Sequence, residues 1–386
     1  MKNLRLALGA LLVLCAIVLM RSQTIAAASL PTKMLVVSVF AFAISRWLRE
    51  RDAGGEARAR GDLVHAMDLT QGNLDFLFYG LQTRFQQAML ATKLYWDQIA
   101  SPTTSATRQE VYGWLDRMPL MREWLGERQV LNLSTRAYVL ANKDYEATIE
   151  LDRDVILDDQ YGVYGYKAAM LGMSAALWPD QLVIAALQNG DATTSLCYDG
   201  QPYFSANHPQ DPDNSASAVQ SNLFTTAGSG ATLLTSANFA TVRANMMAWK
   251  GANGFPINVM PDTIYVPPAL DVTARQIVTS AFTAPAAAVG QNAASVQQSN
   301  VLQNMCRVVT VPKLAGQDTT WYMADTMTIG AIIKGIIFQQ RQSPTFVQKT
   351  APTDDNVFKT RKFLWGVDSR GNAGYTLPFL ITKCGP

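Results

Sequence analysis

The first regular pattern in the chain is an apolar residue at every fourth position. Leu77, Leu81, Phe85 and Met89 follow a more polar opening, Met67–Leu74. Residues spaced four apart share one face of an α-helix, so an amphipathic helix is predicted from Asn73 to about Gln98.

From Gln109 to Asp159 the pattern changes to a period of two. Charged and apolar side chains alternate between Lys143 and Leu151. Because successive side chains of a strand point to opposite faces, this pattern predicts extended strands with one charged face. A long, half-polar hairpin cannot bury enough apolar surface by itself. We therefore expect it to lie on another surface.

The strongest helix signal lies between Gln160 and Gly190. This segment is rich in Ala, Leu and Met, which are good helix formers. Pro179 removes a backbone donor, so a kink or a restart is predicted near Trp178. Asn189 and Gly190 provide the stop.

The rest of the chain mixes short elements with polar segments. A loop rich in Ser, Asn, Pro and Gly is predicted at 207–232, and residues 284–303 are of low complexity. Helices are predicted at Ser236–Lys250 and Leu270–Phe282. Strands are predicted at Thr263–Val266, Val308–Val311, Thr320–Ala324, Ile329–Gln339, Phe358–Val367 and Leu377–Thr382.

Length and charge narrow the class of protein. A chain of 386 residues exceeds the size of one compact core, so two or more lobes are expected. The net charge is +2, but residues 1–66 hold nine Lys and Arg against four acidic residues, which leaves the remainder at −3. A body of that charge lacks the basic stripe of a dedicated nucleic-acid reader.

Few residues could act in catalysis or bind a metal, and their spacing does not match a known catalytic or metal-binding motif. The four cysteines, Cys15, Cys197, Cys306 and Cys384, form no CxxC pair, and free thiols that suit a reducing cytosol are expected. Of the two histidines, His208 is near Cys197 in sequence, but catalytic pairs are normally joined by the fold. Asp211, Asp213 and Asn214 imitate a calcium loop without its Gly and closing Glu. We predict no catalytic residue, cofactor or metal.

The first 66 residues differ in kind from the body. Apolar runs at Leu4–Met20 and Met34–Ile44 are flanked by Lys and Arg. A signal peptide, a two-helix membrane hairpin, and translation that starts later, at Met67, all fit this pattern. We favour the late start, because Met67 opens a regular helix; the intact mass of the mature protein would test it.

Two blocks of motifs carry a family resemblance. The first includes Val111–Pro119, Met121–Arg128 and Leu196–Phe204, and the second includes Ile336–Arg341, Pro344–Val347 and Gly366–Tyr375. In their residues and in their order along the chain, these motifs resemble the major head subunit of Mu-like tailed phages, a capsid protein of the Hong Kong 97 fold. The resemblance covers roughly Met67 to Lys383, weakens in the middle third, and departs from the family's ending at Thr376–Phe379.

The resemblance implies an α+β Hong Kong 97-type fold. After the extension at 1–66, it implies an N-terminal arm at 67–108 and an extended β-hairpin loop at 109–159 that lies on the adjacent subunit. A peripheral domain with a long spine helix is expected at 160–235 and an axial domain at 236–306. Residues 307–386 would supply return strands to both domains.

The function implied is that of a major capsid protein, which self-assembles from pentamers and hexamers into the icosahedral shell around phage double-stranded DNA. Scaffold, protease and portal proteins are implied partners, and assembly is expected in the bacterial cytoplasm. A membrane-associated protein anchored by residues 4–48, and an encapsulin-like compartment, are the alternatives. Candidate contacts between subunits are Tyr112, Trp114, Met118, Met121, Trp124, Tyr138 and Tyr145. The alternative is that Trp114, Met118, Met121 and Trp124 fill the subunit's own core.

Overall fold

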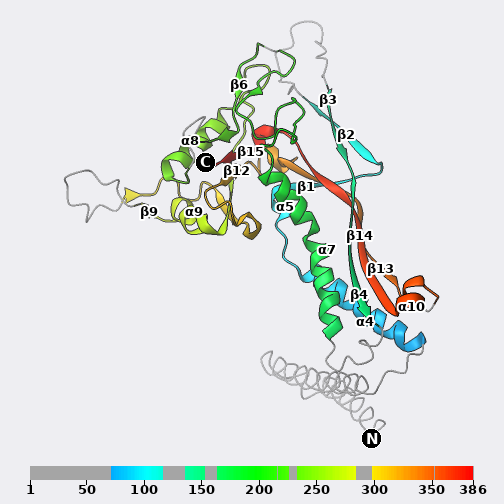
Figure 1. Ribbon diagram of the computed structural model, residues 1–386. Helices are drawn as coiled ribbons and strands as arrows, with labels where there is room; N and C mark the ends of the chain where they lie inside the picture. The colour runs from blue at the N-terminus through cyan, green and yellow to red at the C-terminus, as the bar shows by residue number, and fades with distance from the viewer. Residues whose placement is uncertain are drawn as a thin grey trace, which may run out of the picture. The chain divides into compact units, whose positions relative to one another are not determined.

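The computed structural model has an α+β architecture (Figure 1) and describes residues 71–115, 135–152, 163–214, 216–225, 233–283, 298–351 and 353–385. The chain divides into two compact units, 1–76 with 154–162, and 77–153 with 163–386. Apart from the start of helix α4 (Gln71–Ala91), the described residues lie in the second unit.

A long four-stranded sheet has the order β1-β13-β14-β4. Strand β1 (Ala100–Thr104) runs parallel to β13 (Ile336–Lys349), and the other neighbours are antiparallel. Strands β14 (Lys362–Tyr375) and β4 (Lys143–Asp152) complete it. Helices α4 and α7 (Val163–Gln188) run along this sheet in Figure 1 and share an apolar cluster with it.

The period of two in the sequence is explained by strand β4. Its apolar residues Ala147 and Ile149 pack with Phe85 of α4 and Leu171 of α7, while the polar and charged residues that alternate with them are exposed. All of β4 pairs with β14 of the same chain. Its own sheet and helices therefore cover the apolar face of this strand, and contact of the 109–159 segment with an adjacent subunit stays a prediction.

A five-stranded sheet, β11-β8-β12-β15-β7, separates two apolar cores. Its strands are β7 (Leu223–Phe224), β8 (Thr263–Val266), β11 (Arg307–Thr310), β12 (Trp321–Ala324) and β15 (Ile381–Cys384). Alternate residues face opposite cores. Ile264 and Trp321 pack with helices α8 (Ser236–Met247) and α9 (Asp271–Val278), whereas Tyr265 and Tyr322 pack with the second half of α7. Every residue of β8 and β12 is buried.

Helix α7 continues through Pro179, so of the two predicted effects the restart is wrong and the kink stays a prediction. Its first half packs on the long sheet and its second half on the five-stranded sheet, and this burial on both sides offsets the hydrogen bond that proline removes. Among the described helices it alone has the length and hydropathy of a membrane span, but more than half of it is buried in the protein. These two contacts make it a core helix of this unit.

Near turns, several elements of the structure differ in type or length from those predicted. Residues 329–331 form a 3-10 turn before β13, since the Asp325 carboxylate accepts hydrogen bonds from the backbone N–H groups of Met327 and Thr328. Helix α10 (Asp355–Thr360) precedes β14, and the left-handed Arg361 ends it. Helix α9 ends at Val278 rather than at Phe282, because its last buried side chains are Ile277 and Val278.

The C-terminal departure from the family's ending still produces a strand. A 3-10 turn at Pro378–Leu380 replaces the first half of the strand predicted from Leu377, since proline cannot donate to a sheet. Strand β15 then pairs with β12. The remaining short elements are α5 (Trp96–Ile99), β5 (His208–Pro209), β6 (Val219–Gln220), β9 (Phe282–Thr283) and β10 (Gln298–Ser299).

Candidate assembly surface

A separate two-stranded hairpin rises from the end of the long sheet. Among the described residues, β2 (Gln109–Leu115) and β3 (Thr135–Ala141) pair only with each other. The Tyr112 hydroxyl donates to Gln339 Oε1 (2.8 Å), and the Tyr138 hydroxyl accepts from the Tyr375 N–H (3.2 Å). A two-stranded hairpin is marginally stable alone. These contacts with β13 and β14 therefore hold its base.

The buried Gln339 side chain links both ends of the hairpin to β13. Besides accepting from Tyr112, it donates from Nε2 to Asn142 Oδ1 (2.7 Å) and to the Leu140 carbonyl (3.3 Å). Asn142 in turn donates to Ser105 Oγ (2.8 Å), which precedes β2. One amide thus connects the entry, the exit and one strand of the hairpin to the sheet.

Glu110 fixes the turn that leads into β2. Its carboxylate accepts from the Ser105 hydroxyl (2.8 Å) and from the backbone N–H groups of Ala106 (2.8 Å) and Thr107 (3.0 Å). These hydrogen bonds favour the ionised form, with the Ser105 hydroxyl contributing most, and lower the pKa of Glu110 to about 2.

This lowered pKa predicts a pH dependence for the hairpin base. The ionised Glu110 stabilises the fold above the ordinary carboxyl pKa, and this stabilisation is lost as the pH falls towards about 2. In thermal unfolding, the melting temperature of the wild type should be higher than that of Glu110→Gln at pH 5. This difference in melting temperature should close towards pH 2. A gap that is constant over this range would contradict the assignment.

The structure describes side chains for three of the seven predicted contact residues. Tyr112 and Tyr138 anchor the hairpin as above, and Tyr145 packs on Trp178 with ring centroids 5.5 Å apart. Each of the three therefore contacts its own chain. Trp114 lies in β2, but its side chain is outside the described residues, as are Met118, Met121 and Trp124.

The opposite face of the hairpin contains candidates that sequence reasoning missed. Val111 and Val139 are directly opposite each other across the two strands, and both are at least half exposed. The period of two in the sequence contains this signal, because residues next to an anchoring tyrosine must point away from the body. Exposed apolar pairs on a hairpin are suited to contact another surface.

The Cys197 and His208 side chains do not form a nucleophilic pair. The His208 ring contacts Asp199 Oδ2 through Nδ1 (2.6 Å) and the Tyr203 carbonyl through Nε2 (3.1 Å). The Cys197 thiol instead donates to the Thr376 carbonyl (3.1 Å), and burial raises the pKa of this thiol well above its usual value. In the described part of the chain, no group of three His, Cys, Asp or Glu side chains could hold a metal ion.

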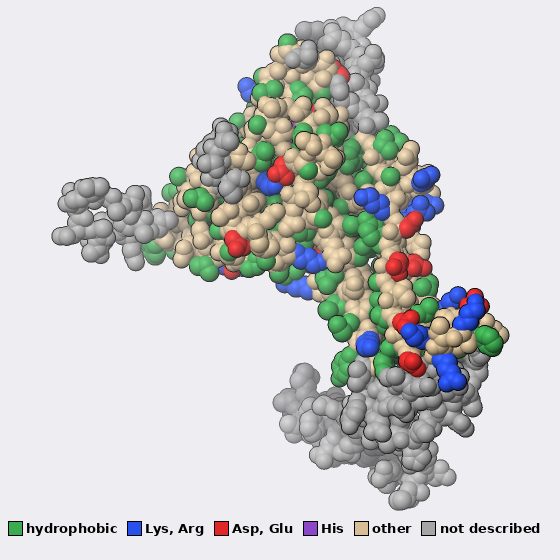
Figure 2. All heavy atoms as spheres, in the orientation of Figure 1, with side chains coloured by type: hydrophobic (Ala, Val, Ile, Leu, Met, Phe, Trp, Pro, Cys, Tyr) green, Lys and Arg blue, Asp and Glu red, His purple; other side chains and the backbone are tan. Residues whose placement is uncertain are grey.

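Exposed apolar side chains are spread over both lobes. Helix α7 presents Tyr166, Met170 and Met173, spaced four and three apart on its outer face. In the view of Figure 2, hydrophobic side chains are scattered across the surface, and charged side chains of both signs gather around α10.

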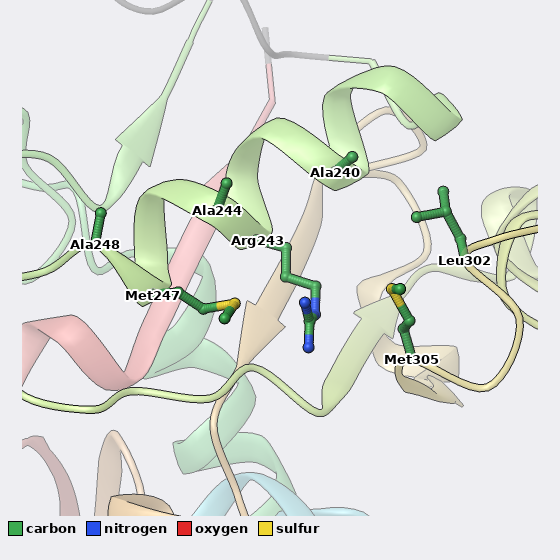
Figure 3. A pocket seen from close by; sticks show the side chains of 7 residues that line it. All are labelled: Ala240, Arg243, Ala244, Met247, Ala248, Leu302 and Met305. Carbon is green, nitrogen blue, oxygen red and sulfur yellow. The ribbon is translucent and has the colours of Figure 1, made fainter.

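A shallow apolar groove of about 460 Å³ lies beside α8 (Figure 3). In that view the Arg243 side chain projects from the helix into the space between Met247 and Met305. The residues that line the groove are Ala240, Arg243, Ala244, Met247, Ala248, Leu302 and Met305.

The long sheet with its spine helix, the second sheet lobe and the anchored hairpin define an α+β capsid subunit of the Hong Kong 97 type. The family model "Mu-like prophage major head subunit gpT" matches residues 74–234, 227–314 and 300–384. The chain therefore belongs to the family of Mu-like prophage major head subunits. The resemblance seen in the sequence motifs is confirmed.

Curated relatives agree with this family. The chain is 25% identical over 311 residues to the major capsid protein of Escherichia phage Mu, covering 80% of this chain and 72% of that protein. It is 26% identical over 299 residues to the Mu-like prophage FluMu major head subunit of Haemophilus influenzae, covering 78% and 68%. A solved relative, from the procapsid of bacteriophage JBD30, is 26% identical, with a TM-score of 0.49 and coverage of 82% and 76%.

These findings establish the general function. The chain is a structural protein that builds the shell of a phage head, and its place is the virion capsid. They favour this function over the compartment and membrane alternatives, because the match spans nearly the whole body of the chain. Residues 4–48, on which the membrane alternative depends, lie outside the described residues.

Proposed function

We propose that this chain assembles into pentameric and hexameric rings that close as an icosahedral shell around double-stranded DNA. The observation that carries the proposal is the family match across residues 74–384. Many weak heterologous contacts around a ring give closure by symmetry, so the function lies in surfaces and not in a catalytic site. We place assembly in the host bacterial cytoplasm.

The described elements support a division of the subunit into an arm, a peripheral part and an axial part. The arm at 67–108 includes α4, and the peripheral part combines α7 with the long sheet. The axial part, 236–306, contributes α8, β8 and α9 to the second lobe, and strands from 307–386 enter both sheets. The extended loop, 109–159, includes the β2–β3 hairpin and strand β4.

The packaged DNA would be confined by the closed wall rather than held by specific contacts. The body carries a net charge of −3. Sequence-independent binding depends on Lys and Arg that neutralise phosphates, so weak and salt-sensitive binding is expected. Scaffold, protease and portal proteins would supply the assembly and packaging steps.

The test of the proposal is recovery of closed particles. The full chain, expressed in bacteria with and without the other head proteins, would be separated by sedimentation and viewed by electron microscopy. Closed shells with five-fold and six-fold clusters are the expected product. Subunits that stay monomeric under both conditions would refute the proposal.

Trp124→Ala tests the extended loop. If Trp124 anchors a contact with a neighbouring subunit, its truncation should cost about 2 kcal/mol or more per contact. The yield of shells should therefore fall while the soluble subunit stays folded by circular dichroism, and Trp124→Phe should retain part of the yield. A variant that unfolds as a monomer would show instead that Trp124 belongs to the subunit's own core.

A further inference from the structure

A histidine of the second lobe is buried against a carboxylate. The side chains of His208 and Asp199 are each 2% exposed, and His208 Nδ1 lies 2.6 Å from Asp199 Oδ2. The other ring nitrogen, Nε2, lies 3.1 Å from the Tyr203 carbonyl oxygen. Both nitrogens of this buried ring therefore face oxygen acceptors.

These two contacts fix the number of protons on the pair. A carbonyl oxygen only accepts hydrogen bonds, so Nε2 carries a proton and donates it to Tyr203. A second proton lies between Nδ1 and Oδ2, because two lone pairs 2.6 Å apart would repel each other. An imidazole nitrogen is a stronger base than a carboxylate, so this second proton is on Nδ1. His208 and Asp199 together form a buried imidazolium–carboxylate pair with no net charge.

The pair closes a loop that is fastened to the C-terminal strand. His208 and Asp199 are nine residues apart, and the Tyr203 carbonyl between them also accepts from Asn222 Nδ2 (2.7 Å). The same Asn222 amide donates to the Pro378 carbonyl (2.8 Å), which precedes strand β15. Opening of the pair would therefore loosen a network that extends into the five-stranded sheet.

The groups packed around the pair stay uncharged or exposed. Burial, and after it the charge of the carboxylate, raises the pKa of the Cys197 thiol well above its usual value. Burial also raises the pKa of the Tyr203 phenol. The Trp249 ring packs beside the imidazole with centroids 6.1 Å apart, and Gln220 is opposite it in the β5–β6 pairing. Lys250, which follows Trp249, is exposed. The charge of this buried site therefore changes through the pair itself.

We propose that the His208–Asp199 pair is a proton-dependent latch on the loop formed by residues 199–222. With two protons, the pair holds this loop closed. Loss of one proton leaves a buried negative charge that the ring no longer compensates, and such a charge is costly. The latch is therefore closed at lower pH, and the loop opens as the pH rises. This inference goes beyond the proposed function and concerns the single subunit.

The proton count can be measured directly, because the chain has two histidines. In His65→Gln, His208 is the single histidine that remains. Nitrogen-15 magnetic resonance of this full chain with labelled histidine should show protons on both ring nitrogens at about pH 6, and loss of the Nδ1 proton by about pH 9. A ring with one proton at the lower pH would overturn the inference.

Opening of the loop can be measured by labelling of Cys197. Its thiol is 6% exposed and donates to the Thr376 carbonyl, and its backbone pairs with Gln201 of the loop, so iodoacetamide should reach it when the loop opens. Cys306, which is 8% exposed and outside the loop, corrects for the general effect of pH on thiols. The ratio of Cys197 to Cys306 labelling, from peptide mass spectrometry, should rise about tenfold between about pH 6 and about pH 9, the effect of one hydrogen bond to a charged group.

Asp199→Asn separates the latch from other effects of pH. An amide at this position donates to an Nδ1 that has no proton, while Nε2 still donates to Tyr203, so a ring with one proton keeps the loop closed. The labelling ratio of Asp199→Asn should therefore change by less than about twofold over this pH range. The control, Asp213→Asn, removes an exposed carboxylate of the same loop and should show the rise seen in wild type.

Two results of the labelling would overturn the inference. One is a ratio in wild type that does not change with pH, and the other is an equal rise in wild type and Asp199→Asn. If Asp199→Asn does not fold, the rise in wild type must occur over the pH range in which Nδ1 loses its proton, and a rise without that loss refutes the latch. These measurements do not depend on assembly, so the capsid function stands in either case.

Discussion

Replacing Gly172 by alanine is expected to release helix α4 from helix α7. A Cβ atom at Gly172 would lie 2.2 Å from the Phe85 carbonyl oxygen, so the two helix backbones touch at this point. Overpacking of this kind costs roughly 1–3 kcal/mol. The helix can avoid the clash only by moving, and it would then lose the packing of Phe78 on Trp365 and of Phe85 on Phe346.

The expected readout is local rather than global. The two cores around the five-stranded sheet do not include α4. Gly172→Ala should therefore stay folded by near-ultraviolet circular dichroism but become sensitive to protease within 71–91, and shell assembly should fall sharply if α4 belongs to an arm that contacts neighbours.

Gly80→Ala is the matched control. It lies within α4 and a Cβ atom there would meet nothing within 4 Å. Alanine should stabilise the helix by up to about 1 kcal/mol. Protease resistance in Gly172→Ala equal to that of Gly80→Ala would show that the helices do not touch at Gly172.

Gln339→Leu is expected to free the β2–β3 hairpin from the long sheet. The substitution leaves the Asn142 side chain, the Leu140 carbonyl and the Tyr112 hydroxyl without their present partner. Each buried polar group left unpaired costs roughly 1–3 kcal/mol. The melting temperature should fall by several degrees, and hydrogen exchange should quicken in β2 and β3.

Gln340→Leu provides the comparison for this substitution. Its side-chain amide donates to Ser343 Oγ (3.2 Å), in an exposed contact. The neighbouring substitution should therefore change the melting temperature little. If the melting temperature of Gln339→Leu equals that of Gln340→Leu, the amide of Gln339 does not hold the base of the hairpin.

Local signals were sufficient for elements whose pattern is strong and whose ends are marked. Helix α8 and strand β8 begin where the sequence predicts, because Thr235 caps the helix with its side chain and Pro267 follows the strand. Element type was predicted wrongly at 329–331, where a short apolar run precedes a strand, and at 358–360, where a short helix ends before one. Such runs fit a turn or a strand equally well, and the Asp325 hydrogen bonds that form the first turn are invisible in a periodic pattern.

The family and the two-faced character of residues 143–151 follow from the order and alternation of the residues alone. Only the tertiary structure decided what each face contacts. A period of two assigns side chains to faces, but the partner of a face depends on strand register between residues far apart in the chain, such as Ala147 and Val367. For the same reason Tyr112 and Tyr138 became anchors of their own subunit, and Met247 became exposed while Met246 was buried.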